Sequence, residues 1–224
     1  MELIVAPRAS ASESMAFDEG LFNKAEKGIL CPTLRIYSWL RPSITVGYSQ
    51  SLDDEIDLEL CGEYGIDVAK RPTGGGIDFH SPSDIAFGIL LDAEDSRILL
   101  QKTSNAVRKA LKFLGVEPAV ADSNSDRDRR FCCSYPSRFE LEVGGRKIAG
   151  IAQRRGRRSV LQQVSIAVSG NVDNMLKCLK NGISAERYTL KTTCLTEQIG
   201  RAPDISEFSE ALAGEMEAGV PISY

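Results

Sequence analysis

The sequence has little of what a metal-bound or disulfide-stabilised protein needs. Among its 224 residues there is one histidine, and no two of the six cysteines have Cys-x-x-Cys spacing. Structural zinc sites use four Cys and His ligands that lie close together in such motifs, so we expect no metal site. In a reducing compartment most cysteines behave as small buried residues. The six are Cys31, Cys61, Cys132, Cys133, Cys178 and Cys194.

Long apolar runs and an excess of positive charge are also missing. No stretch approaches the ~20 apolar residues that cross a membrane, and the first residues lack the basic segment and long apolar core of a secretory signal. We therefore expect a cytoplasmic protein with no membrane partner. A net charge of −4 and a pI near 5.3 argue against a nucleic-acid partner.

The order of the predicted elements indicates the fold class. Helical and strand patterns mix without a steady βαβ rhythm, so we expect an α+β fold with a mixed, mainly antiparallel sheet and flanking helices. Helices are predicted from a capping box at residue 10 to a glycine stop at 28, and over 52–64, 95–114, 172–180 and 205–217. Strands are predicted over 33–39, 43–48, 66–70, 77–80, 85–91, 138–143, 146–153 and 159–169.

The most informative motif begins at Arg71 and reads Arg-Pro-Thr-Gly-Gly-Gly-Ile-Asp-Phe-His. Because Gly74, Gly75 and Gly76 carry no Cβ, their backbone N–H groups can approach a ligand closely. The alternative is an ordinary turn between two strands. With Arg71 and His80 at the two ends of the motif, we expect these five residues to bind an acyl or anionic group.

His80 is the only histidine of the chain. A lone histidine is more often a hydrogen-bonded structural group than a catalyst. Its position at the end of the glycine motif favours a role in positioning the ligand over a role in proton transfer. Asp84 is the candidate that orients the imidazole ring, provided that the chain bends between the two residues.

A second motif, residues 145–154, reads Gly-Arg-Lys-Ile-Ala-Gly-Ile-Ala-Gln-Arg and follows a Gly-Gly hairpin signal. Lys147 is its single lysine, and Gly150 leaves space for substrate beside it. In a binding pocket the ammonium of Lys147 can neutralise negative charge that develops on an acyl oxygen or a phosphate. The alternative is a solvated hairpin lysine, the commonest environment of this residue type.

Taken together, these motifs resemble the lipoate–protein ligase and octanoyltransferase family, which is related more distantly to the biotin–protein ligases. The resemblance implies a seven-stranded α+β catalytic fold that attaches lipoyl or octanoyl groups to a lysine of lipoyl-bearing domains. We expect residues 1–224 to be a single catalytic domain without the full C-terminal accessory domain of the ligases. The segments that carry the resemblance are 15–19, 32–37, 46–48, 65–68, 71–80 and 145–154.

Two chemistries are open within this resemblance. In one group of octanoyltransferases a cysteine four residues before a Pro-Ser pair holds the acyl group as a thioester, and Cys132 has this spacing to Pro136. In this preferred interpretation acyl carrier protein is the donor and no cofactor is needed. In the alternative, an ATP-dependent ligase joins free lipoate to the domain with Mg²⁺, and the intact triple glycine favours it.

Other interpretations also stay open. Residues 162–165 read Gln-Gln-Val-Ser where many relatives have Gln-His-Gly-Ser, which is consistent with a non-catalytic acyl-binding module. The adjacent Cys132 and Cys133 are consistent with a thiol sensor. Four arginines among residues 154–158 form either a solvated hairpin tip or a docking surface for acidic partner proteins.

Overall fold

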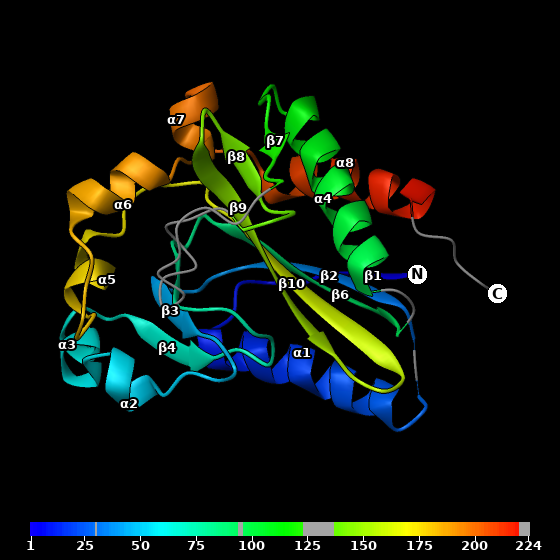
Figure 1. Ribbon diagram of the computed structural model, residues 1–224, viewed down its shortest axis with the longest axis horizontal. Helices are drawn as coiled ribbons and strands as arrows, with labels where there is room; N and C mark the ends of the chain where they lie inside the picture. The colour runs from blue at the N-terminus through cyan, green and yellow to red at the C-terminus, as the bar shows by residue number, and fades with distance from the viewer. Residues whose placement is uncertain (30, 94–95, 123–136, 220–224) are drawn as a thin grey trace.

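The computed structural model describes residues 1–29, 31–93, 96–122 and 137–219, and its main element is a seven-stranded sheet (Figure 1). Only its first pair of strands is parallel. The prediction of an α+β fold with a mixed, mainly antiparallel sheet is therefore confirmed. In spatial order the strands are β1 (Glu2–Val5), β2 (Thr33–Ser38), β6 (Ile85–Asp92), β10 (Ser159–Ile166), β9 (Arg146–Arg155), β8 (Leu141–Val143) and β7 (Ala119–Val120).

A second sheet of three strands lies beside the first. Its central strand β3 (Ser43–Val46) pairs with β4 (Asp67–Lys70) in parallel and with β5 (Asp78–His80) in antiparallel orientation. The glycine motif connects β4 to β5. The loop is therefore anchored at both ends in the small sheet, which fixes its position relative to β9 and β10.

Helices cover both faces of the large sheet (Figure 1). The long helix α1 (Ala11–Glu26) lies on one face, and α4 (Ser96–Phe113) and α8 (Ile205–Gly219) lie on the other. The predicted capping box of α1 is present, because Ser10 Oγ accepts from the Glu13 backbone N–H at 3.3 Å and Ser10 N–H donates to Glu13 Oε2 at 2.9 Å. The helix ends at Glu26, and the predicted glycine stop follows it at Gly28, whose φ of 87° suits glycine.

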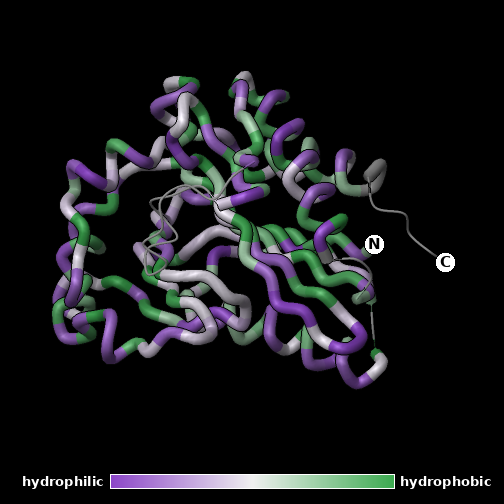
Figure 2. Tube along the Cα trace, in the orientation of Figure 1, coloured by the Kyte–Doolittle hydropathy of each residue, from purple (hydrophilic) through white to green (hydrophobic). Residues whose placement is uncertain are grey.

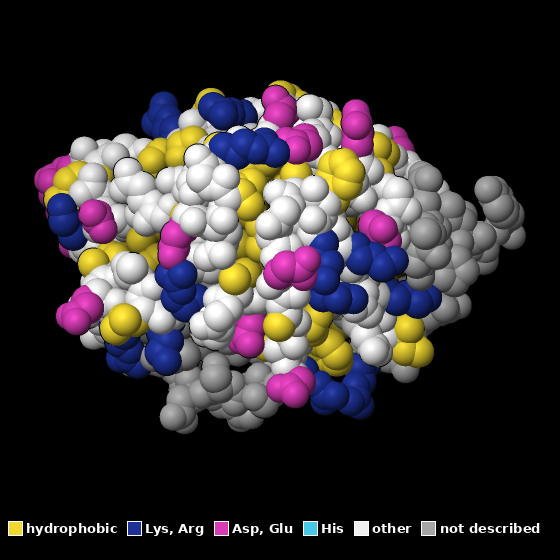
Figure 3. Space-filling model, turned by 90° about the horizontal axis from the view of Figure 1, so that it is seen from above, with side chains coloured by type: hydrophobic (Ala, Val, Ile, Leu, Met, Phe, Trp, Pro, Cys, Tyr) yellow, Lys and Arg dark blue, Asp and Glu magenta, His cyan; other side chains and the backbone are white. Residues whose placement is uncertain are grey.

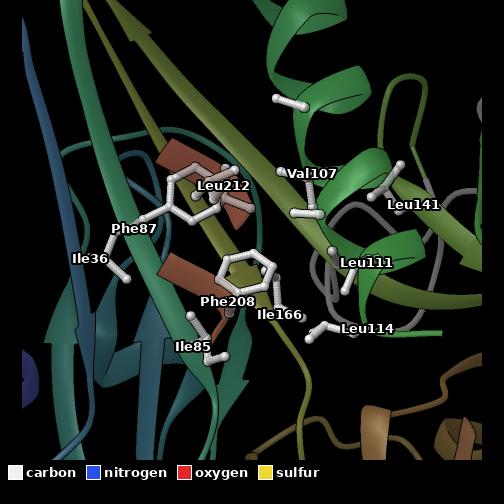
Figure 4. Packing of buried hydrophobic residues seen from close by; sticks show 14 of the residues in the cluster. Ile36, Ile85, Phe87, Val107, Leu111, Leu114, Leu141, Ile166, Phe208 and Leu212 are labelled. Carbon is white, nitrogen blue, oxygen red and sulfur yellow. The ribbon is translucent and has the colours of Figure 1, made fainter. Parts of the chain in front are cut away.

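The largest apolar core fills the layer between the sheet and these two helices. Phe87 of β6, Leu111 of α4 and Phe208 of α8 are each completely buried there (Figure 4). Along α4 hydrophobic and hydrophilic residues alternate, as expected for a helix with one buried face (Figure 2). The central strands β2, β6 and β10 are instead buried along almost their whole length, because helices cover both faces of the sheet. A second core lies under the small sheet, where α3 (Leu58–Glu63) and α5 (Asp173–Lys177) pack.

Some local predictions differ from the structure. The single helix predicted over 52–64 is two helices, α2 (Leu52–Glu55) and α3, because Ile56 is extended and Asp57 caps α3 by accepting from Leu60 N–H at 3.0 Å. The strands predicted on either side of the Leu-Arg-Pro turn do not pair with each other, since β2 belongs to the large sheet and β3 to the small one. None of the described helices is both long and apolar enough to span a membrane.

Several short elements were not predicted from the sequence. Each of them is too short to show a hydrophobic period in the sequence, so its conformation is set by tertiary contacts. Two of them, α6 (Ala185–Lys191) and α7 (Leu195–Ile199), follow β10 and bring the chain back to β9, where Thr193 N–H donates to the Lys147 carbonyl at 2.9 Å. The missed elements are β1, β7, α6 (Ala185–Lys191) and α7 (Leu195–Ile199).

Candidate functional site

The glycine loop is held from inside the protein by Arg71. The Arg71 side chain is 6% exposed, and its guanidinium donates to the carbonyls of Gly76 at 2.7 Å and Gly74 at 3.3 Å. A second nitrogen donates to the carbonyl and the hydroxyl of Thr45 on β3, at 3.0 and 2.7 Å. Arg71 thus binds the loop carbonyls and links the loop to the small sheet, while Gly75 stays exposed.

Gly47, directly after β3, lets the loop pack this closely. A Cβ at Gly47 would lie only 1.8 Å from the Gly75 carbonyl oxygen, and Gly75 itself has a φ of +96°. On the same side, Tyr48 N–H donates to the Thr73 carbonyl at 2.9 Å. Gly47 lies in one of the segments that carry the family resemblance, but its contact with the loop was not predictable from local sequence pattern.

Lys147 forms a buried ion pair with Glu140. Lys147 Nζ donates to Glu140 Oε1 at 2.9 Å, and the two side chains are 6% and 7% exposed. The same carboxylate accepts from Ile151 N–H at 3.1 Å and, through its second oxygen, from Ser137 N–H at 2.6 Å. Burial raises the pKa of Glu140, and the neighbouring ammonium of Lys147 opposes that shift.

Gly150 makes room for the lysine side chain. A Cβ at Gly150 would lie 3.1 Å from both Cε and Nζ of Lys147 and 3.4 Å from Glu140 Oε1. The glycine spacing of the motif therefore permits Lys147 to fold back over its own strand toward Glu140. Glu140 was not singled out from the sequence, because a glutamate in a strand is usually solvated.

His80 is fixed between the two sheets. Its Nε2 lies 2.8 Å from Thr45 Oγ1, its Nδ1 lies 3.1 Å from Ser165 Oγ, and its ring stacks on Trp39 with centroids 4.0 Å apart. Burial lowers the pKa of His80 to about 4, and the charge of Arg71 contributes to the lowering. A neutral imidazole in a fixed orientation fits the predicted positioning role.

The suggestion that Asp84 orients His80 is wrong. The Asp84 carboxylate closes its own turn by accepting from Ser81 N–H at 2.7 Å, and it also accepts from Val168 N–H at 2.8 Å. The chain does turn at 81–84, but both carboxylate oxygens of Asp84 accept hydrogen bonds from Ser81 within that turn rather than from the imidazole. Ser165 on β10 takes that position instead.

A polar network that the sequence did not reveal connects the loop to α1. Gln163 accepts from Thr73 Oγ1 at 2.7 Å and donates to Asp18 Oδ2 at 2.8 Å. Asp18 is in turn paired with Arg35 of β2 at 3.0 Å, with side chains 1% and 4% exposed. The amide of Gln163 thus bridges two elements that flank the site.

These elements enclose one cavity. Five of the eight expected site residues line it: Arg71, Gly75, His80, Lys147 and Gly150. Gly74 and Gly76 belong to the loop that borders it, and Cys132 lies outside the described residues. Apolar side chains of Met15, Trp39, Ala86 and Ile151 form much of the remaining wall. The cavity thus combines an apolar wall with a polar end, which suits an acyl group with a carbonyl or carboxyl head.

Within the described part of the chain, no group of three or more His, Cys, Asp or Glu residues is arranged to hold a metal ion.

The arginine-rich tip of the β9–β10 hairpin is hydrogen-bonded to α1, since Glu26 accepts from the Arg157 and Arg158 N–H groups at 2.8 and 3.1 Å. On the face drawn in Figure 3, basic and acidic side chains are interspersed.

Comparison with known structures places the fold among the lipoate- and biotin-ligase-like proteins. Lipoate-protein ligase A bound with ATP superposes with a TM-score of 0.79 at 24% identity, covering 97% of this chain and 84% of that chain. A biotin protein ligase from Aquifex aeolicus superposes less closely, with a TM-score of 0.51 at 13% identity over 98% of this chain and 68% of that one.

The family itself follows from sequence. The sequence model of the lipoyl protein ligase A/B catalytic domain matches residues 10–217. Octanoyltransferase LipM of Carboxydothermus hydrogenoformans is 34% identical over 96% of this chain and 84% of that protein, and LipM of Symbiobacterium thermophilum is 33% identical over 90% and 79%. The chain belongs to the lipoyl protein ligase A/B catalytic domain family and is an enzyme of this kind.

Replacing Gly47 by alanine tests how tightly the loop is packed. The clash is with a backbone carbonyl, which no side-chain rotation relieves, so the loop must move. We expect Gly47→Ala to lower the free energy of unfolding by about 2 kcal/mol or more and to speed hydrogen exchange at residues 73–76. Gly62→Ala is the control, because nothing lies within 4 Å of its added Cβ. Unchanged exchange in Gly47→Ala would contradict the packing described here.

The protonation of His80 can be followed directly, because it is the only histidine. We expect its imidazole NMR signals to titrate at about 4 in the folded protein and near 6.5 in the unfolded chain. Since the unfolded state then binds the proton more tightly, the contribution of His80 to stability is complete above pH ~6.5 and falls by about 3 kcal/mol as the pH approaches 4. A folded-state midpoint near 6.5 would show that the ring is solvated.

Proposed function

We propose that this enzyme transfers an octanoyl or lipoyl group to a specific lysine of a lipoyl-bearing domain, through a thioester on Cys132. The observation that carries the proposal is the buried Lys147–Glu140 pair at the polar end of an apolar cavity. The names of the LipM relatives support octanoyl transfer as the chemistry. Acyl carrier protein is the proposed donor, and residues 1–224 act as one catalytic domain.

In the transfer step, the amine of the acceptor lysine attacks the thioester carbonyl carbon. The C–S bond breaks, its electron pair goes to the sulfur of Cys132, and the thiolate takes up the proton that the attacking nitrogen loses, so the products are the amide and the free thiol. Negative charge that develops on the carbonyl oxygen is stabilised by the ammonium of Lys147 and by N–H groups of the glycine loop. Glu140 fixes that ammonium in advance, so the stabilising charge needs no rearrangement during the reaction.

A hydrogen bond close to Cys132 in the sequence supports its proposed role in this mechanism. Ser137, which donates to Glu140 at 2.6 Å, follows Cys132 by five positions in the sequence. The carboxylate that holds Lys147 therefore also anchors the chain just after the proposed nucleophile. This supports the assignment of the two residues to one reaction centre.

An ATP-dependent lipoate ligase is the second candidate. It is favoured by the intact triple glycine and by the fold shared with lipoate-protein ligase A bound with ATP. In this case free lipoate, ATP and Mg²⁺ replace the acyl-carrier donor, and the glycine loop and Lys147 would bind the acyl-adenylate. The acceptor is the same, and a ligase from Thermoplasma acidophilum has been determined in a study that includes its E2 lipoyl domain.

Cys132→Ala separates the two chemistries. With octanoyl-loaded acyl carrier protein as donor and no ATP, we expect the variant to lose octanoylation of a lipoyl domain by about 1,000-fold or more, because the nucleophile is gone. Cys133→Ala is the matched control and should keep most of the activity. Full transfer by Cys132→Ala would eliminate the thioester route, and activity only with lipoate and ATP would favour the ligase.

Lys147→Met removes the ammonium while keeping the length of the side chain. We expect transfer to fall by about 100-fold or more with either donor, because both routes develop negative charge at the acyl group. Loss of the ammonium also leaves Glu140 buried without its counter-ion, so the double variant with Glu140→Gln is the control for folding. Wild-type turnover in a folded Lys147→Met enzyme would show that the lysine has only a structural role.

A further inference from the structure

A second cavity lies on the other side of Lys147. It is bordered by residues of β5 and β9 and by Tyr188 and Thr192, from α6 and the position after it. Four residues line both this cavity and the one described above: Asp78, Lys147, Gly150 and Ser165. The lysine is therefore approached from two directions, with these four residues between them.

The two approaches differ in chemistry. The first has the apolar side chains of Met15, Trp39 and Ala86 along its wall, which suit an alkyl chain. The second has the hydroxyl-bearing Tyr188 and Thr192 opposite the glycine-containing strand β9. Because an acyl group already occupies the first cavity in the proposed function, the second is available to the group that receives it.

Asp78 is an acidic side chain that lines both cavities. It precedes His80 by two positions on β5, so the two side chains lie on the same face of the strand. Asp78 is half-buried, and its carboxylate accepts from the N–H of Phe79 at 3.1 Å. Among the residues that the structure describes, no lysine or arginine forms an ion pair with it, whereas Lys147 is paired with Glu140.

We propose that the second cavity admits the lysine side chain of the acceptor domain and that Asp78 binds its ammonium. The inference rests on the proposed function and adds an acceptor subsite to it. A lysine side chain arrives protonated, since its pKa is near ~10.4 in solution. The ammonium of Lys147 would repel it, and a half-buried carboxylate without a counter-ion offsets that repulsion through a charge-assisted hydrogen bond.

The arrangement also gives the acceptor amine its direction. An amine held at Asp78 lies at the boundary of the two cavities, next to the ammonium that is proposed to stabilise the acyl carbonyl oxygen. The bound acyl group and the acceptor lysine then reach the reacting centre from different cavities, so the lysine can enter while the acyl chain stays in place. Asp78 is thus assigned as a substrate-binding residue: it binds the ammonium on arrival, and the nitrogen attacks after that ammonium has lost one proton to solvent.

Asp78→Asn tests the inference, because the amide keeps the size of the side chain and an oxygen for the Phe79 N–H while it removes the charge. Asp92→Asn, at the exposed end of β6, is the matched control. Each variant is first loaded with its acyl group by the donor that the wild-type enzyme uses, and loading is read from the intact mass or the bound acyl-adenylate. The loaded enzyme is then given either the lipoyl domain or hydroxylamine, a nucleophile that is uncharged at neutral pH.

We expect Asp78→Asn to load like the wild type and to react with hydroxylamine at the wild-type rate. Transfer to the lipoyl domain should fall about tenfold or more, mainly through a higher KM for the domain, while Asp92→Asn transfers normally. Wild-type transfer by Asp78→Asn, or an equal loss with hydroxylamine, would overturn the subsite. A wild-type enzyme that modifies no lipoyl domain with either donor would refute the proposed function and this inference together.

Discussion

The ion pair between Lys147 and Glu140 is the interaction on which the rest of the site depends. Both side chains are almost completely buried, and such a pair gains little net stability because each charge loses its hydration. The pair instead serves the site, because it holds a positive charge at the polar end of an apolar cavity. Two further features follow from it: Gly150 has to lack a side chain, and Glu140 has to be held by the Ser137 and Ile151 N–H groups.

Strand β10 connects this pair to the remainder of the molecule. Because its side chains alternate, Gln163 and Ser165 face the loop and α1, whereas Gln162 faces α4 and donates to Gln153. Ser165 orients His80, and Gln163 joins Thr73 of the glycine motif to Asp18. The loop is thus fixed from three sides, by β10, by Arg71 and by the close contact with Gly47. Such rigidity is what a site that stabilises a developing charge requires.

Local rules predicted the features that depend on neighbouring residues. The capping box of α1 and the β8–β9 hairpin at Gly144 and Gly145 are examples, and the two site motifs were recognised from residue type and spacing. Features that depend on distant residues were not predictable in this way. Gly47 meets Gly75 and Asp18 meets Gln163 only after two sheets and a helix have assembled, and no short-range pattern carries that information.

The central claim is that the cavity beside Lys147 serves acyl transfer through an enzyme-bound thioester. The most direct measurement is the intact mass of the protein after mixing with octanoyl-loaded acyl carrier protein, with no acceptor domain and no ATP present. The account predicts one added octanoyl group that hydroxylamine removes and that peptide mapping assigns to Cys132. A protein that stays unmodified under these conditions, yet modifies a lipoyl domain when given lipoate and ATP, would contradict the thioester and establish the ligase chemistry.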